Sequence, residues 1–298
     1  MEIIFALLAV LLNTLIAFLI SVQYRYLVGF IDKKISYFSA FVIVSLSFFL
    51  RLIMISKGGS FLGTPIAGKL KEGIALSKGT IIIAFENITY TSWQLFILVL
   101  ILAFNRRFIE KNMFFTIPLI FLIIILMIFS LYKYDKFLSL FFKIYNVLPF
   151  KLRKLIKRTG LKKENIDNYF LKLKLLFSNK LFLLNYNFIS FLIIIISPFL
   201  IFLLSRSYLI HINYFDSFTV YWFSYILGRL SGLPIGLGVR DVSAGFFLTN
   251  LGVSATIALQ IVFLYRLISF IPFLPFGLAY FIKYGKEKIL GIYNQNKN

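Results

Sequence analysis

Residues 232–252 read Gly-Leu-Pro-Ile-Gly-Leu-Gly-Val-Arg-Asp-Val-Ser-Ala-Gly-Phe-Phe-Leu-Thr-Asn-Leu-Gly and lie between two long apolar runs. The stretch holds five glycines, one proline and the adjacent charges Arg240 and Asp241. Glycine and proline at this density interrupt a helix. At membrane depth, irregular backbone persists only where protein or a watery cavity surrounds it. The stretch is therefore predicted to contribute to a binding site, with an ordinary loop between helices as the alternative.

The composition is that of an integral membrane protein. Hydrophobic residues make up 60% of the 298 residues and charged residues 14%, whereas soluble domains contain about 25% charged residues. The chain has no cysteine, which excludes disulfides, thiolate catalysis and cysteine metal sites. The single histidine, His211, cannot form a conventional histidine metal site, so neither a metal nor a cofactor is predicted.

The net charge is +21, from 32 Lys and Arg against 11 Asp and Glu. Because these charges lie between apolar runs, they favour contact with anionic lipid headgroups over binding of nucleic acid. Residues 133–184 alone carry 13 basic and three acidic residues. Within them, residues 151–158 have the pattern of a basic amphipathic helix at the membrane interface.

About seven apolar segments, with a range of six to eight, are predicted to cross the membrane. They are residues 3–22, 35–55, 80–104, 114–132, 185–204, 214–230 and 254–282. The chain is therefore predicted to be all-α, a polytopic protein of the cell membrane whose single transmembrane domain covers 1–298. The distribution of basic residues does not fix its orientation, although a cytoplasmic connector at 133–184 is preferred. Charged residues near span ends, such as Arg51 and Arg229, are expected to reach the interface by snorkelling.

The chain contains a weak internal repeat. Gly63-Thr-Pro65-Ile-Ala aligns with Gly232-Leu-Pro234-Ile-Gly at an offset of 169 residues. At the same offset Lys71-Glu72 falls on Arg240-Asp241, while a gap is needed to bring Glu86 beside Arg266. The repeat predicts two similar halves, each with a re-entrant, breaker-rich segment, which meet near the middle of the membrane as in transporters. A parallel pair follows from seven spans, and one miscounted span would make the pair inverted.

The predicted division is a first half at 1–104, a linking span at 105–132, the basic connector at 133–184, a second half at 185–284 and a polar tail at 285–298. The residues expected to contact substrate are Arg240, Asp241, Arg266, Glu86, Lys71 and Glu72. The motif glycines and prolines are Gly63, Pro65, Gly232, Pro234, Gly236 and Gly238. Arg240 would bind a phosphate with its planar guanidinium. An ion pair between Arg240 and Asp241 that pins the segment is the alternative.

Residues 234–241, residues 248–255 and Tyr265-Arg266 resemble the second-half signature of the lysylphosphatidylglycerol synthase transmembrane-region family. Gly63, Pro65 and Lys71-Glu72 resemble its first-half signature, although Asn87 and Tyr90 replace an expected arginine and aspartate. The resemblance implies a flippase-like membrane module. A stand-alone module is expected, because no aminoacyl-transferase domain follows the last span.

The leading prediction is thus translocation of a phosphate-bearing lipid, a phospholipid or a polyprenyl-phosphate lipid, and not an enzymatic reaction. No Gly-x-x-x-x-Gly-Lys-Ser/Thr run is present, so a nucleotide is not the expected energy source. The alternatives are an intramembrane lipid-modifying transferase, with Asp241 or Glu86 as its base, and a non-catalytic membrane scaffold. The chain is a possible homo-oligomer.

Overall fold

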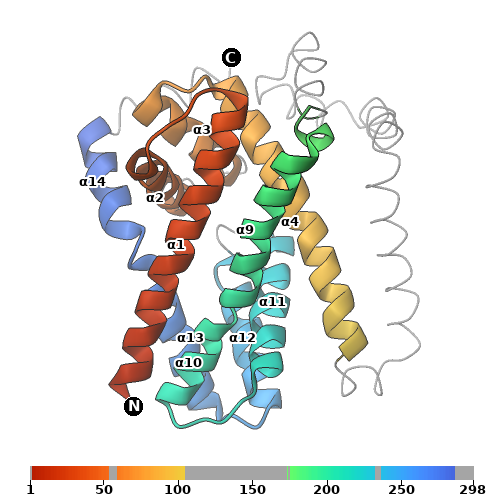
Figure 1. Cartoon of the computed structure of the whole chain (residues 1–298). Helices are drawn as coiled ribbons and strands as arrows, with labels where there is room; N and C mark the ends of the chain where they lie inside the picture. Colours follow the sequence, from red (N-terminus) through yellow and green to blue (C-terminus); the bar gives the residue numbers. More distant parts are fainter. Residues whose placement is uncertain (1, 54–58, 105–172, 174, 232–235, 286–298) are drawn as a thin grey trace, which may run out of the picture. The chain divides into compact units, whose positions relative to one another are not determined.

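A computed structural model describes residues 2–53, 59–104, 173, 175–231 and 236–285 (Figure 1). Regular structure in these ranges is entirely helical, which confirms the all-α membrane fold. The chain divides into two compact units, of which the first comprises Met1–Phe85 and Asn168–Gln295. The second is described only over residues 86–104. The predicted linking span, almost all of the basic connector and nearly all of the polar tail lie outside the described residues.

The described helices fall into two groups along the chain. The first group is α1 (Ile3–Ile31), α2 (Tyr37–Ile53), α3 (Gly59–Glu72) and α4 (Leu76–Phe104). The second group is α9 (Lys180–Ile196), α10 (Phe199–Ser207), α11 (Tyr214–Leu230), α12 (Val239–Asn250), α13 (Ala255–Phe270) and α14 (Leu274–Tyr284).

Helix α1 runs antiparallel to the pair α9–α10 (Figure 1). The backbone N–H of Glu2 donates to the carbonyl of Ser207 at 2.7 Å, which joins the start of α1 to the end of α10. The amide of Asn185, near the start of α9, donates to the hydroxyl of Tyr26 at 3.2 Å. The first unit thus has two ends, and we name the one where α1 ends and α9 begins the basic end.

The basic end takes its name from its lysines. Among the described residues it carries Lys33, Lys34, Lys69, Lys71, Lys78, Lys180 and Lys283, with the acids Asp32 and Glu72. The opposite end carries Arg206 and His211 with the acids Glu2 and Asp216. Basic residues therefore concentrate at one end of the unit.

Helices α2 and α3 form an antiparallel hairpin that opens at the basic end. The Arg25 side chain donates to the carbonyl of Ile35 at 2.7 Å before α2 begins. At the end of α3, Glu72 pairs with Lys33 at 3.4 Å. The 14 residues of α3 span about 21 Å at 1.5 Å per residue, too short for a hydrocarbon core of about 30 Å. This first hairpin is therefore re-entrant.

Helices α11 and α12 form a second re-entrant hairpin, which opens at the opposite end. The rings of Phe223 and Phe247 lie 5.2 Å apart near the middle of the two helices. Gly228 and Arg240 approach each other near the tip of the hairpin. The 12 residues of α12 span only about 18 Å. The two hairpins thus enter the first unit from opposite ends.

This arrangement bears on the relation between the two halves, which the sequence left open as parallel or inverted. The predicted spans at 35–55 and 214–230 are arms of hairpins, so the two halves are inverted and not parallel. Within the described residues, three helices are long and apolar enough to cross a membrane, or up to four if the bent pair α13–α14 is one span. The physical reason is pairing, because each of these apolar runs packs against a short helix that returns toward the end of the unit where the run began.

The structure also corrects the register of the repeat. Lys71 and Glu72 end α3, whereas Arg240 and Asp241 lie in the first turn of α12. The equivalent residues are instead Gly73 and Gly252, which follow the two short helices with φ of 67° and 89°. This conformation suits glycine at the C-terminal end of a helix. Aligning these two glycines gives an offset of 179 residues between the halves, whereas the motif alignment gave 169.

A proline breaks the span α13–α14, whose two helices are bent by 46°. Pro272 has no N–H, so the carbonyl of Ile268, four residues earlier, has only the N–H of Ile271, at 3.2 Å, as its backbone donor. The side-chain amide of Asn13 on α1 donates to this carbonyl at 2.8 Å. Because the membrane interior offers no water for such a group, Asn13 explains how α1 stabilises the break.

A proline, Pro198, also stands between α9 and α10, although these two helices together form one continuous candidate span, Lys180–Ser207. Pro198 cannot donate to the carbonyl of Ile194, and the indole N–H of Trp222 on α11 does so at 3.2 Å. The hydroxyl of Tyr214 donates to the neighbouring Ile195 carbonyl at 2.7 Å. The second hairpin thus contacts the α9–α10 span next to Pro198 through Tyr214 and Trp222, which the sequence predicts only to pack or to face lipid.

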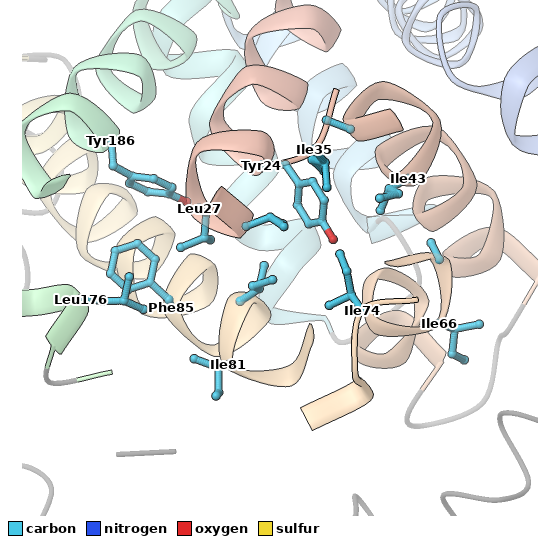
Figure 2. Packing of buried hydrophobic residues seen from close by; sticks show 14 of the residues in the cluster. Tyr24, Leu27, Ile35, Ile43, Ile66, Ile74, Ile81, Phe85, Leu176 and Tyr186 are labelled. Carbon is cyan, nitrogen blue, oxygen red and sulfur yellow. The ribbon is translucent and has the colours of Figure 1, made fainter. Parts of the chain in front are cut away.

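Two clusters of buried side chains hold the first unit together. One lies toward the basic end, where Tyr24, Leu27, Ile43 and Tyr186 pack with residues of α3 and α4 (Figure 2). The other joins α1 to α10, α12 and α13; its buried members include Ala9, Ile16, Leu204, Leu248 and Ile261. Each hairpin therefore has its own packed surroundings.

Candidate functional site

The tip of the second hairpin places Asp241 between two donors. The Asp241 carboxylate accepts from Arg266 Nε at 2.5 Å and from Arg266 Nη2 at 3.1 Å, a two-pronged pair across α12 and α13. Its Oδ2 also accepts from the backbone N–H of Gly238 at 3.0 Å. Asp241 is the third residue of α12, so it satisfies one of the free N–H groups at that helix start. One carboxylate therefore fixes both the helix start and the contact with α13.

Arg240 is held by tyrosines. Its guanidinium carbon lies 5.2, 4.7 and 5.0 Å from the ring centres of Tyr221, Tyr225 and Tyr265. Its Nη2 donates to the Tyr265 hydroxyl. We call this group the tyrosine cage. Three ring faces attract a cation electrostatically, and the attraction is strongest where water is excluded.

The Arg240 side chain is buried, with 8% of its surface exposed. Its Nε is also buried and has no hydrogen-bond partner in the part of the chain that the structure describes. Over the same residues, no carboxylate lies within ion-pair distance of Arg240. The charges of Arg240, Asp241 and Arg266 add to one positive charge, and the cage holds that charge without a carboxylate of its own.

Arg240 and Asp241 do not pair with each other, which corrects the ion pair considered from the sequence. Consecutive helical side chains point about 100° apart, so residues i and i+1 do not face each other. Arg240 turns toward α11 and Tyr265, while Asp241 turns toward Arg266. The adjacent charges thus have separate partners, and their roles can be tested separately.

Close packing of glycines forms the base of the site. A Cβ atom on Gly228 of α11 would lie 2.7 Å from Arg240 Cβ, and one on Gly236 would lie 2.9 Å from Gly228 Cα. Gly236 also has φ of 67°, a conformation that side chains other than glycine rarely adopt. Gly238 has φ of 80° and open space around it. Gly232 and Pro234 lie outside the described residues.

The first-half motif is divided between the two ends of its hairpin. Gly63 lies near the tip, where a Cβ atom would be 3.0 Å from the Ser47 carbonyl oxygen. Pro65 packs against α4, since a Cβ atom on Gly79 would lie 2.8 Å from Pro65 Cα. Both residues thus take part in helix packing.

Lys71 and Glu72, by contrast, lie at the open end of the first hairpin, where α3 ends; we call this end the mouth. The Lys71 ammonium is 5.1 Å from the centre of the Tyr280 ring on α14. Tyr280 is 14 residues beyond Arg266 along the chain and lies on the other side of the break between α13 and α14. The structure therefore separates Lys71 and Glu72 from the tyrosine cage.

Glu86 lies on α4, in the second unit, and is partly buried. It is the eleventh residue of α4, and Arg266 is the twelfth of α13. Helix α4 follows the first hairpin and α13 follows the second, so the two residues hold neighbouring positions of equivalent helices.

Sequence reasoning missed two members of the tyrosine cage. Like most aromatic residues of this chain, Tyr221 and Tyr225 are predicted from the sequence only to pack or to face lipid. Their spacing of four residues places them on one face of α11, where their rings stack at 6.4 Å. A pair of tyrosines at helical spacing before a breaker segment with an arginine is the signal that could have found them.

No group of acidic or histidine side chains suited to hold a metal ion occurs within the described ranges. A model of the family described as "Lysylphosphatidylglycerol synthase TM region" matches residues 1–277 of the chain. The matched range includes both hairpins, the tyrosine cage and the start of α14. No curated protein and no solved structure matches the chain.

Proposed function

The chain belongs to the lysylphosphatidylglycerol synthase TM region family, as its motifs predicted, and on this premise we propose that it translocates a phosphate-bearing lipid across the cell membrane. The lipid is a phospholipid or a polyprenyl-phosphate lipid, and it leaves the protein chemically unchanged. The family and the apolar helices support an integral membrane protein with several spans.

The observation that carries the proposal is a buried arginine without a carboxylate partner among the described residues. An isolated charge is costly within a membrane and marks functional positions there. Asp241 is adjacent in sequence but is engaged with Arg266 and Gly238. A permanent carboxylate would compete with a substrate anion, whereas the tyrosine cage stabilises Arg240 and leaves its charge for a phosphate.

The inverted hairpins support transport rather than simple binding. Inverted repeats with interrupted helices are the arrangement that many transporters use to open a central site alternately to each side. Here one hairpin opens at the basic end and the other at the opposite end. The second hairpin contacts α13, and the first contacts residues on both sides of the break between α13 and α14. The break gives the protein a place to bend close to Arg266.

We assign the basic end to the cytoplasm, because lysine and arginine are enriched on that side of membrane proteins. The N-terminus then lies outside the cytoplasm. Lys180, the first residue of α9, is at the basic end, and this assignment agrees with the cytoplasmic connector preferred from its charge.

The test is lipid translocation in liposomes that contain the purified protein. Fluorescent phosphatidylglycerol and a fluorescent polyprenyl phosphate are followed by the fraction that a membrane-impermeant quencher can reach. Arg240→Gln removes the charge with little change in length, and we expect the rate to fall at least about tenfold, since a hydrogen bond to a charged group contributes about 1.5–3 kcal/mol.

Arg206→Gln is the matched control. Arg206 makes the same kind of contact with an aromatic ring, 5.2 Å from Phe202, but lies at the end of α10 outside the site. Its translocation rate should equal that of the unmodified protein. A folded Arg240→Gln protein that moves both lipids at the unmodified rate would disprove the assignment of Arg240.

A further inference from the structure

The first hairpin has a partly buried arginine of its own near its tip. Arg51 lies in the last turn of α2, and its Nη2 donates to the Thr64 hydroxyl on α3 at 2.8 Å. The Thr64 hydroxyl also shares a hydrogen bond of 2.6 Å with Ser47. The sequence predicts that Arg51 snorkels to the interface, but the structure directs it across the hairpin. Arg51 is therefore held by the Thr64 hydroxyl, which Ser47 in turn contacts.

Like Arg240, Arg51 has no acidic partner among the described residues. Its Nε is buried without a hydrogen-bond partner in that part of the chain, and no carboxylate there lies within ion-pair distance. Gly63 allows this approach, since a Cβ atom there would be 3.1 Å from Arg51 Cγ. A positive charge, a free N–H group and a neighbouring hydroxyl together fit a phosphate oxygen.

The two arginines lie on hairpins that meet the same span. Arg240 contacts Tyr265 of α13, while Phe48, three residues before Arg51, packs on Phe270 and Phe273 at 5.6 and 5.0 Å. These contacts fall within about two helical turns of each other along the span α13–α14. The contacts differ in chemistry, with three aromatic rings in the second hairpin and two hydroxyl groups in the first.

We propose that Arg51, with Thr64, forms a second phosphate-binding site, which receives the lipid headgroup from the leaflet at the basic end. Arg240 forms the corresponding site on the side of the opposite leaflet. This inference rests on the proposed function, and it adds a site in the first hairpin that the headgroup occupies before or after Arg240. The shared chemistry of both sites is a phosphate oxygen bound by a guanidinium group.

The test counts bound lipids on the whole protein in a phosphate-free maltoside detergent. Native mass spectrometry with dioleoyl phosphatidylglycerol as the probe should show two sites on the unmodified protein and on Arg206→Gln. Arg51→Gln and Arg240→Gln should each lose one site, and the double variant both. Thr64→Val, which keeps the shape of the side chain, should weaken the Arg51 site without removing the Arg240 site.

The possible failures are distinct. Two sites on Arg51→Gln together with one on Arg240→Gln would overturn this inference and leave the proposed function standing. One site on Arg51→Gln together with two on Arg240→Gln would instead contradict the proposed role of Arg240. Thermal melting of each variant shows whether it is folded. If Arg51→Gln does not fold, Arg51→Lys keeps the charge, and its loss of the guanidinium fork should weaken the Arg51 site at least about tenfold.

A second arm separates a lipid headgroup from free phosphate. Inorganic phosphate is added in tenfold excess over the probe lipid. Retention of both lipids supports headgroup sites, because the acyl chains add binding that the free ion lacks. Displacement of the lipid that depends on Arg51 would overturn its assignment to lipid.

Discussion

The first and second hairpins share a plan but differ in where they place their charges. Each joins an apolar helix to a short returning helix that ends at a glycine with positive φ. In the second, the adjacent base and acid lie at the tip and contact α11 and α13. In the first, Lys71 and Glu72, which the sequence aligned with that pair, lie at the mouth. There Glu72 forms an ion pair with Lys33, and the Lys71 ammonium lies over the Tyr280 ring. The comparison teaches that helix ends, and not charge patterns, define equivalent positions in this protein.

The largest expected effect is a difference in unfolding free energy between variants of Asp241, in the second hairpin, and Glu72, in the first. Asp241→Asn removes the negative charge that Arg266 contacts in a site where Arg266 is 8% exposed, and we expect a loss of about 3–5 kcal/mol in unfolding free energy. Glu72→Gln removes a partner of Lys33, whose side chain is 50% exposed, and should cost at most about 1 kcal/mol. Unfolding of the purified variants in detergent micelles measures both. Equal losses would contradict the difference between tip and mouth.

Packing at the tips provides the second prediction. Gly228→Ala places a methyl group 2.7 Å from Arg240 Cβ and should cost about 1–3 kcal/mol by overpacking. Gly63→Ala should cost less, since its nearest contacts are 3.0 and 3.1 Å.

The control for this packing series is Gly245→Ala. Gly245 lies inside α12, and a methyl group there would have no neighbouring atom within 4 Å, so alanine should stabilise the helix by up to about 1 kcal/mol. Melting temperatures in detergent should follow the order Gly245→Ala, Gly63→Ala, Gly228→Ala from highest to lowest. Reversal of the last two would show that the first hairpin has the tighter tip.

The smallest expected effect concerns the broken span that both hairpins contact. Asn13→Leu removes the amide that donates to Ile268 and should cost about 0.6 kcal/mol, the average for such bonds between membrane helices. In a Pro272→Ala background the cost should be smaller, because residue 272 then adds an N–H for a carbonyl that otherwise accepts only from Asn13 and from the N–H of Ile271. A double-mutant cycle of unfolding measures the coupling. A full additive cost would mean that Asn13 does not compensate for Pro272.

Much of the fold was predictable from composition and local chemistry. A chain with 60% hydrophobic and 14% charged residues must place helices in a membrane, because helices satisfy their own backbone groups there. The glycines and proline of residues 232–252 likewise indicated an interruption that carries charge. The family was recognisable from residues 234–241 and 248–255, and the match over residues 1–277 confirms it.

Tertiary structure decided which residues share a site. The sequence shows Arg240 beside Asp241, but helix geometry turns them toward partners 25 residues away on α13. It also shows apolar runs at 35–55 and 214–230, but only the returning helices α3 and α12 reveal that these runs are arms of hairpins. Pairing of an apolar run and the direction of a side chain depend on neighbours distant in sequence, so residue patterns determined the membrane fold while packing determined its inversion and its site.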